Sequence, residues 1–158
     1  MAMRGPRIVT AAALWGALSE WVRMGGTVVV CGGEKSQSLL DAGGVLTPFL
    51  PGKFQRTLPL RQANAIEIYC LSAIAVARQA EGGRIEIPCT QISDVKGAVE
   101  AHEGNLPLIV RRAYGFGSVV FVAFDLDRAP LDKWADRPAL VGKLLGLPAA
   151  SSEATRQG

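Results

Sequence analysis

The chain has 158 residues, of which 49% are hydrophobic and 20% are charged. This length corresponds to one domain with a substantial core, and this balance excludes an intrinsically disordered chain. The net charge is +3, the basic residues are scattered, and no stripe of Lys and Arg interleaved with aromatics is present, so we expect no nucleic-acid partner.

Residues suited to metal or disulfide chemistry are few. The three cysteines are Cys31, Cys70 and Cys89, and the single histidine is His102. The odd number and wide spacing of the cysteines do not form a disulfide framework, and no CxxC or Cys/His spacing indicates zinc. We therefore expect no metal site and no cofactor.

The first predicted element is a helix from Thr10 to about Met24, ended by the glycines at 25–26. Its basic start and apolar run loosely resemble a signal peptide. No small-residue cleavage site follows, however, and the apolar stripe continues into the helix end, which favours a structural helix. No run of about 18 apolar residues occurs, so we expect no membrane span in this chain.

Residues 27–31 (TVVVC) predict a strand that is covered on both faces because it is continuously apolar. Residues 34–41 predict a short helix, followed by an irregular loop rich in Gly and Pro. Residues 53–60 (KFQRTLPL) predict a strand that Pro59 restricts to an edge or an end. Helix, glycines and buried strand together indicate an α/β unit.

The middle of the chain carries conflicting patterns. Residues 63–69 (ANAIEIY) alternate like a strand, whereas residues 71–81 (LSAIAVARQAE) predict a helix that ends at the glycines 82–83. Residues 84–92 (RIEIPCTQI) predict a strand interrupted at Pro88.

Residues 107–127 (PLIVRRAYGFGSVVFVAFDLD) predict a β-hairpin, since two β-rich runs flank a turn with two glycines. The second run, residues 118–124, is apolar on both faces and therefore central in a sheet. Its end delivers Asp125 and Asp127 just beyond the core.

The C-terminal part of the chain predicts one more helix. It opens at Ala135 or Asp136, before an Arg-Pro pair, and runs to about Leu145. Residues 149–158 are small and polar, which predicts a disordered tail. The chain is thus read as a single domain over residues 1–148.

The segments LSEWVRMGGTVVVCGG and PLIVRRAYGFGSVVFVAFDLD resemble the class I glutamine amidotransferase-like superfamily. Within it, the chain most resembles non-catalytic domains of bacterial envelope proteins, which show WV..GG.LVV and YG.G.VVF.AFD. The resemblance spans about residues 12–147 and is poor from 45 to 90. It implies a flavodoxin-like three-layer α/β sandwich with a mainly parallel sheet. It also implies a bacterial protein associated with the envelope, on its periplasmic or cytoplasmic face.

Two departures from the family pattern shape the expected function. Active members place a nucleophilic cysteine where Cys31 falls, but their later His-x-Glu pair is replaced here by Asp125 and Asp127. The resemblance therefore implies a catalytically inactive interaction or scaffold module. The family's first strands lie upstream of the helix that begins near Thr10, so this chain resembles a C-terminal portion or a shortened version. Its open sheet edge would need covering by a partner protein or a second copy.

A cysteine-dependent hydrolase or amidotransferase using Cys31 is the alternative. A nucleophilic cysteine needs a base or a positive field, and a neighbouring Asp125 would instead raise its pKa. His102, the only imidazole of the chain, lies in AVEAHEGN, read as a polar loop. A Cys31–His102 dyad would need this loop to fold back to Cys31. The other reading of Cys31 is a small apolar residue at a strand end.

A small-anion or nucleotide binding module is the second alternative. Gly32 and Gly33 could offer backbone N–H groups at the strand end, beside Asp125 and Asp127. The pair of glycines lacks the G-x-G-x-x-G pattern and the P-loop lysine. The acidic segment DLDRAPLDKWAD also lacks the calcium-loop spacing, and turn or capping roles explain its later aspartates.

Overall fold

The computed structural model of the chain describes residues 11–34, 37, 46–72, 74 and 86–148. It contains a four-stranded sheet in the order β1-β6-β5-β4 and a two-stranded sheet made of β2 and β3. In chain order the elements are α1 (Ala11–Arg23), β1 (Thr27–Cys31), η1 (Thr47–Phe49), β2 (Lys53–Leu60), α3 (Asn64–Cys70), β3 (Ile87–Ser93), β4 (Ala98–Glu103), β5 (Leu106–Tyr114), β6 (Gly117–Val122), η3 (Leu131–Lys133) and α5 (Arg137–Leu144).

The expectation of a mainly parallel, flavodoxin-like sandwich is wrong. Only β1 and β6 pair in parallel, whereas β6–β5, β5–β4 and β2–β3 are antiparallel. The apolar run of β6 correctly indicated burial, whereas in β1 only Val30 is buried and the other four residues are partly exposed. An apolar run does not by itself determine strand direction. Direction follows from the connections: tight turns join β4 to β5 and β5 to β6, and strands joined in that way must run antiparallel. The fold is a mixed α/β fold.

Several local predictions are confirmed. The helix α1, the strand β1, the strand β2 and the helix α5 lie where the sequence places them. The hairpin β5–β6 is present, and β6 is central because it lies between β1 and β5. Most of the predicted helix over 34–41 and most of that over 71–81 lie outside the described residues, as does the tail 149–158.

Two segments differ from their predictions. Residues 64–70 form a helix, in which Ile66 and Tyr69 face the core three positions apart and Ile68 is exposed. The segment around His102 is not a loop but the edge strand β4. The polar side chains of this segment made it resemble a loop in the sequence. In the structure one of them, Glu100, forms an ion pair with Arg111 on the neighbouring strand β5.

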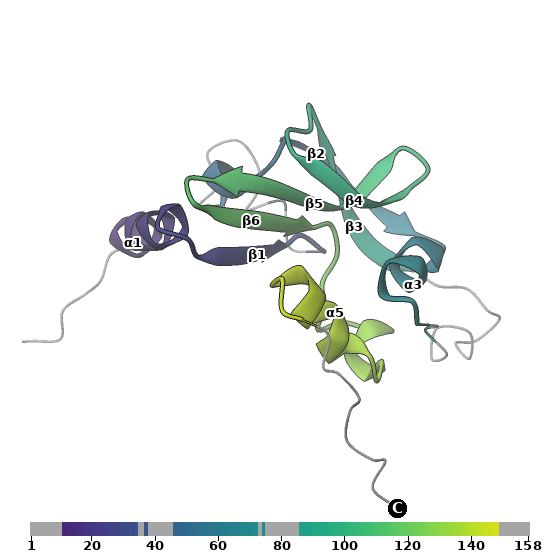
Figure 1. Cartoon of the computed structure of the whole chain (residues 1–158). Helices are drawn as coiled ribbons and strands as arrows, with labels where there is room; N and C mark the ends of the chain where they lie inside the picture. Colours follow the sequence, from purple (N-terminus) through teal and green to yellow (C-terminus); the bar gives the residue numbers. More distant parts are fainter. Residues whose placement is uncertain (1–10, 35–36, 38–45, 73, 75–85, 149–158) are drawn as a thin grey trace, which may run out of the picture.

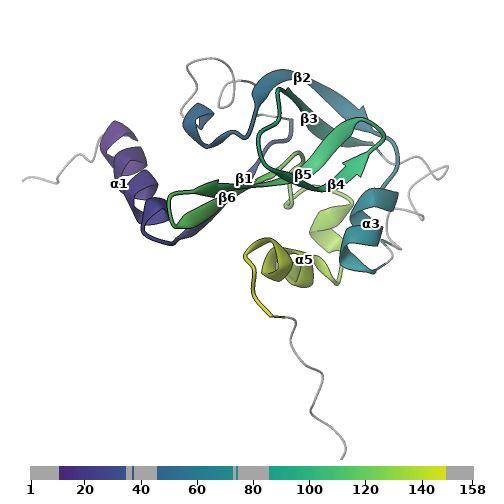
Figure 2. The same ribbon diagram turned by 45° about the horizontal axis from the view of Figure 1, so that its top comes forward.

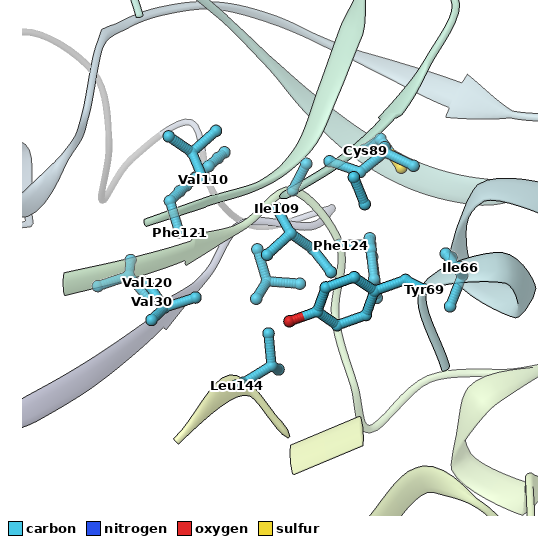
Figure 3. Close-up of a cluster of buried hydrophobic side chains, with 14 of the residues drawn as sticks. Val30, Ile66, Tyr69, Cys89, Ile109, Val110, Val120, Phe121, Phe124 and Leu144 are labelled. Carbon is cyan, nitrogen blue, oxygen red and sulfur yellow. The ribbon is translucent and has the colours of Figure 1, made fainter. Parts of the chain in front are cut away.

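The core fills both sides of the four-stranded sheet. Figures 1 and 2 show the β2–β3 pair on one side of this sheet and the helices α3 and α5 on the other. The two sheets are joined at Phe124, which forms an isolated bridge with Cys89. Figure 3 shows side chains from both sheets and from α3 and α5 meeting in one buried cluster, including Val30, Ile109 and Leu144.

The helix α1 lies at the far end of the molecule from α3 (Figures 1 and 2). The turn of the β5–β6 hairpin packs against its C-terminus, where the Phe116 N–H donates to the Arg23 carbonyl at 2.8 Å. A Cβ at Gly117 would lie 2.1 Å from the Val22 and Gly26 carbonyl oxygens, so only glycine fits there. This contact fixes the point at which β1 enters the sheet.

Candidate functional site: the β1–β6 strand ends

The parallel pairing of β1 with β6 brings the two predicted site segments together. Cys31 pairs with Val122, and the Gly32 N–H donates to the Val122 carbonyl at 2.7 Å. Parallel strands present their carboxyl ends at the same edge of a sheet, so the residues after β1 meet those after β6. The placement of Cys31 beside the aspartates that follow β6 agrees with the sequence argument.

Asp125 fastens the turn that follows β1. Its Oδ2 accepts a hydrogen bond from the Glu34 N–H at 3.3 Å, and a Cβ at Gly33 would lie 1.9 Å from that same oxygen. Arg128 bridges the two acids, because it forms an ion pair with Glu34 and lies 3.7 Å from Asp125. The side chain of Asp125 therefore occupies the space beside Gly33 that an anion would need.

The environment of Cys31 disfavours its thiolate. Burial is the largest cause that raises the pKa of Cys31 to about 11, and the carboxylates of Asp125 and Asp127 raise it further. A nucleophilic cysteine requires the opposite environment, namely a nearby cation or base that stabilises the thiolate. At neutral pH this cysteine is a protonated, half-buried thiol.

His102 does not reach Cys31. It lies exposed on β4, and its Nδ1 is 3.0 Å from the Gly104 carbonyl oxygen. In the strand order β1-β6-β5-β4, three interstrand spacings separate the two strands, which is about 14 Å. The geometry of the described residues does not form the Cys31–His102 dyad.

The other two cysteines also have raised pKa values. Burial raises the pKa of Cys70 to about 11, although Lys143 opposes this, and raises the pKa of Cys89 to about 12. Cys89 is fully buried between the two sheets. Within the described part of the chain, no group of three or more His, Cys, Asp and Glu residues gathers to hold a metal ion.

The outer edge of β1 is the second feature of this site. The bonds of Gly26 and Gly32 to β6 show that even-numbered residues of β1 direct their backbone groups inward. By the alternation of a strand, Thr27, Val29 and Cys31 direct their N–H and C=O groups away from the sheet. No strand of the described residues pairs with this side. We predicted an open sheet edge on the ground that strands of the family fold lie upstream of Thr10. The unpaired side found in the described residues belongs to β1, and the sequence could not show this because a strand's position in a sheet is not a local property.

The described residues contain no helix that is both long and apolar enough to cross a membrane. No protein-family model matches the chain, and no curated protein matches it. Similarity to known proteins is therefore limited to solved structures, and the resemblance to the class I glutamine amidotransferase-like superfamily stays a prediction.

Three solved structures illustrate this similarity. The Cytoplasmic Protein STM1381 from Salmonella typhimurium LT2 matches with a TM-score of 0.56 and 16% identity, over 85% of this chain and 60% of that chain. Exo-beta-1,4-mannosidase Op5Man5 from Opitutaceae bacterium strain TAV5 matches with a TM-score of 0.48 and 16% identity, over 84% of this chain and 22% of that chain. Beta-galactosidase from Bacillus circulans sp. alkalophilus matches with a TM-score of 0.47 and 18% identity, over 82% and 20%.

This chain thus spans about a fifth of the length of each of these two glycosidases and 60% of the length of the Salmonella protein. At these identities the likeness to the Salmonella protein concerns the fold alone. The chain resembles that protein in fold, and its function has to be argued from its own residues.

Proposed function

We propose that the chain is a catalytically silent interaction module that associates with a second copy of itself through the outer edge of β1. The observation that carries this proposal is the row of outward backbone groups at Thr27, Val29 and Cys31, which no described strand pairs. Catalytic silence is supported by the raised pKa of Cys31 and by the distance of His102 from it.

The composition of β1 favours strand addition. Edge strands of monomeric proteins are usually protected by Lys, Pro or a bulge, because unpaired backbone groups invite pairing with another chain. The strand TVVVC contains none of these, and its register with β6 is continuous over all five residues. An antiparallel pair of such strands, centred on Val29, would let each outward residue exchange both of its hydrogen bonds with the opposite copy.

The charges at the two ends of β1 favour a second copy as the partner. The exposed Arg23 precedes the strand and makes this end basic. The other end is acidic, because three carboxylates and one guanidinium lie there, namely those of Glu34, Asp125, Asp127 and Arg128. A two-fold antiparallel arrangement brings the basic end of one copy beside the acidic end of the other. No charge within the strand itself opposes this pairing.

Sedimentation velocity over the micromolar concentration range tests the proposal, and we expect a reversible monomer–dimer equilibrium. Val29→Pro removes an outward N–H without removing a bond to β6, so it should shift the equilibrium to monomer. Val29→Thr keeps that N–H and the β-branched shape, and is the matched control that should still dimerise.

Hydrogen exchange makes the test independent of how well the proline variant folds. The amides of Thr27, Val29 and Cys31 should exchange more slowly in concentrated than in dilute wild-type protein. A wild-type chain that is monomeric at every concentration, or whose β1 exchange does not depend on concentration, contradicts the proposal.

A further inference from the structure

A basic hollow lies apart from the β1–β6 strand ends. It has a volume of about 630 Å³ and opens where the start of β2, the β3–β4 turn and β5 meet. Its walls are the segments 50–53 and 94–96 together with Arg112. The lining carries three cations and one carboxylate, which is a net charge of +2. This charge is opposite to that of the acidic strand ends, so the hollow would attract an anion.

Arg112 lines this hollow and is held in place by two contacts. Its Nη1 donates to the Leu50 carbonyl at 3.1 Å, and its guanidinium lies 5.9 Å from the centre of the Tyr114 ring. The other N–H groups of this guanidinium form no hydrogen bond or ion pair with the described residues. A guanidinium that is anchored by one nitrogen presents its remaining donors in a fixed fork, which suits a phosphate or a carboxylate.

Backbone contacts join the two segments that form the walls of the hollow. The Lys96 N–H donates to the Pro51 carbonyl at 2.6 Å, and a Cβ at Gly52 would lie 2.5 Å from the Ser93 carbonyl oxygen. Asp94 adopts a positive φ of 51°, which a residue other than glycine rarely does. The two segments are thus locked together before any ligand enters, which reduces the entropy lost on binding.

The two lysines of the hollow are free to meet a ligand. Lys53 lies 3.3 Å from Asp94, but both side chains are mostly exposed, so this ion pair is weak and exchangeable. Lys96 is exposed and forms no ion pair with the described residues. An anion between Lys53 and Lys96 would contact two cations, and only the solvated ion pair of Lys53 with Asp94 would be given up.

We infer that this hollow binds a small organic phosphate. A phosphate monoester carries about −1.5 to −2 charges at neutral pH, which matches the charge of the lining. Its oxygens would accept from Arg112 and the two lysines, while its organic part would lie against Leu50, Pro51 and Val95. The volume lies within the range of pockets for small ligands and exceeds what inorganic phosphate alone would fill. This site is separate from the β1 edge and goes beyond the proposed association.

Calorimetric titration of the full chain with phenyl phosphate, inorganic phosphate, phthalate and benzoate tests the inference. Phenyl phosphate should bind more tightly than the other three, because it alone combines a phosphoryl dianion with an apolar body. Absence of phenyl phosphate binding overturns the inference, and so does tighter binding of phthalate, which would assign the hollow to dicarboxylates. Equal binding of inorganic and phenyl phosphate, which would indicate an adventitious ion only, also overturns it.

Variants and amide shifts locate the bound molecule. Arg112→Gln should weaken phenyl phosphate binding by about tenfold or more, and Lys96→Met by about two- to fivefold. Lys133→Met removes an exposed lysine outside the hollow and should leave the affinity unchanged. If Arg112→Gln fails to fold, two other measurements decide, namely the affinity of Lys96→Met and the amide shifts of wild-type protein, which must centre on 52–53 and 94–97. Shifts centred on Gly32 and Gly33, or affinity unaffected by Lys96→Met, overturn the inference.

Discussion

The carboxylate of Asp125 accepts a hydrogen bond from the backbone N–H of Glu34, which lies 91 positions earlier in the chain. This single contact joins the turn after β1 to the segment after β6. The Asp125 side chain also fills the space beside Gly33, and its charge adds to the effect of burial in raising the pKa of Cys31. In this chain the carboxylate of Asp125 therefore has a structural role.

Gly33→Ala should destabilise the fold because the added methyl group would overlap Asp125 Oδ2. We expect a loss of about 1–3 kcal/mol in the free energy of unfolding, measured by denaturant titration. The double variant with Asp125→Gly should lose less than the sum of the two single variants. Gly16→Ala is the matched control, since nothing lies within 4 Å of its Cβ, and it should gain about 0.5–1 kcal/mol. Additive effects of Gly33→Ala and Asp125→Gly would contradict the close contact.

Cys31 should resist alkylation at neutral pH. Iodoacetamide reacts with the thiolate, and a pKa of about 11 leaves almost none of it at pH 7. Peptide mapping by mass spectrometry should show labelling of Cys31 that rises steeply only above about pH 10. Asp125→Asn removes one of the charges that raise this pKa and should shift the profile to lower pH. Stoichiometric labelling within minutes at pH 7, or release of ammonia from glutamine by the wild-type chain, would support the cysteine-dependent alternative.

Stability should fall at alkaline pH because the folded state disfavours the thiolates. The ordinary pKa of a cysteine is 9.0, whereas that of Cys89 is about 12 in the folded chain, mainly because of burial. Below pH 9 both states keep the proton and no stability is lost. As the pH rises from 9 towards 12, the unfolded chain ionises first, and the free energy of unfolding decreases.

Chemical denaturation between pH 8 and 11 measures this slope, and Cys89→Ala should flatten it relative to wild type. Cys70→Ala is the comparison variant, and its effect should be smaller because this thiol is only half-buried. An unchanged slope in Cys89→Ala would show that other groups determine the alkaline stability.

A disulfide can report the register of the proposed dimer. In an antiparallel pair centred on Val29, the two copies of this residue face each other with their Cα atoms about 5.5 Å apart, which suits a disulfide. Val29→Cys in a Cys31→Ala background should give a covalent dimer on mild oxidation, seen by non-reducing electrophoresis. Val28→Cys in the same background is the control, because its counterpart lies too far away. Equal crosslinking of the two variants would exclude this register.

Local signals in the sequence were sufficient for the hairpin and for β1. The glycines 115 and 117 specify the tight turn, and TVVVC is both β-branched and bounded by glycines. The direction of the strands was not local information. The apolar run of β6 indicated a central strand, but only its neighbours decide that one pair is parallel and the others antiparallel.

The candidate site was predictable in part for the same reason. A buried strand ending at Cys31 and another ending before Asp125 suggested that these residues meet, and the parallel β1–β6 pair brings them together. The basic hollow was not predictable, because Lys53, Lys96 and Arg112 come from three segments that only the packing of the two sheets unites. The helix α3 was misread because Ile66 and Ile68 alternate with polar residues, although only Ile66 is buried.

The pairing of β1 with β6 also has a consequence for the order of assembly. Thr27 lies opposite Ser118, so β1 leaves the ribosome long before its partner strand β6 has been synthesised. Bringing Thr27 and Ser118 together closes a long loop, and the entropy cost of closing it is larger than the cost of closing the short turns of the local hairpins. We expect the three hairpin-linked strands to form first and the valine-rich strand to dock last, so that the nascent chain exposes these valines until translation has passed the β5–β6 turn.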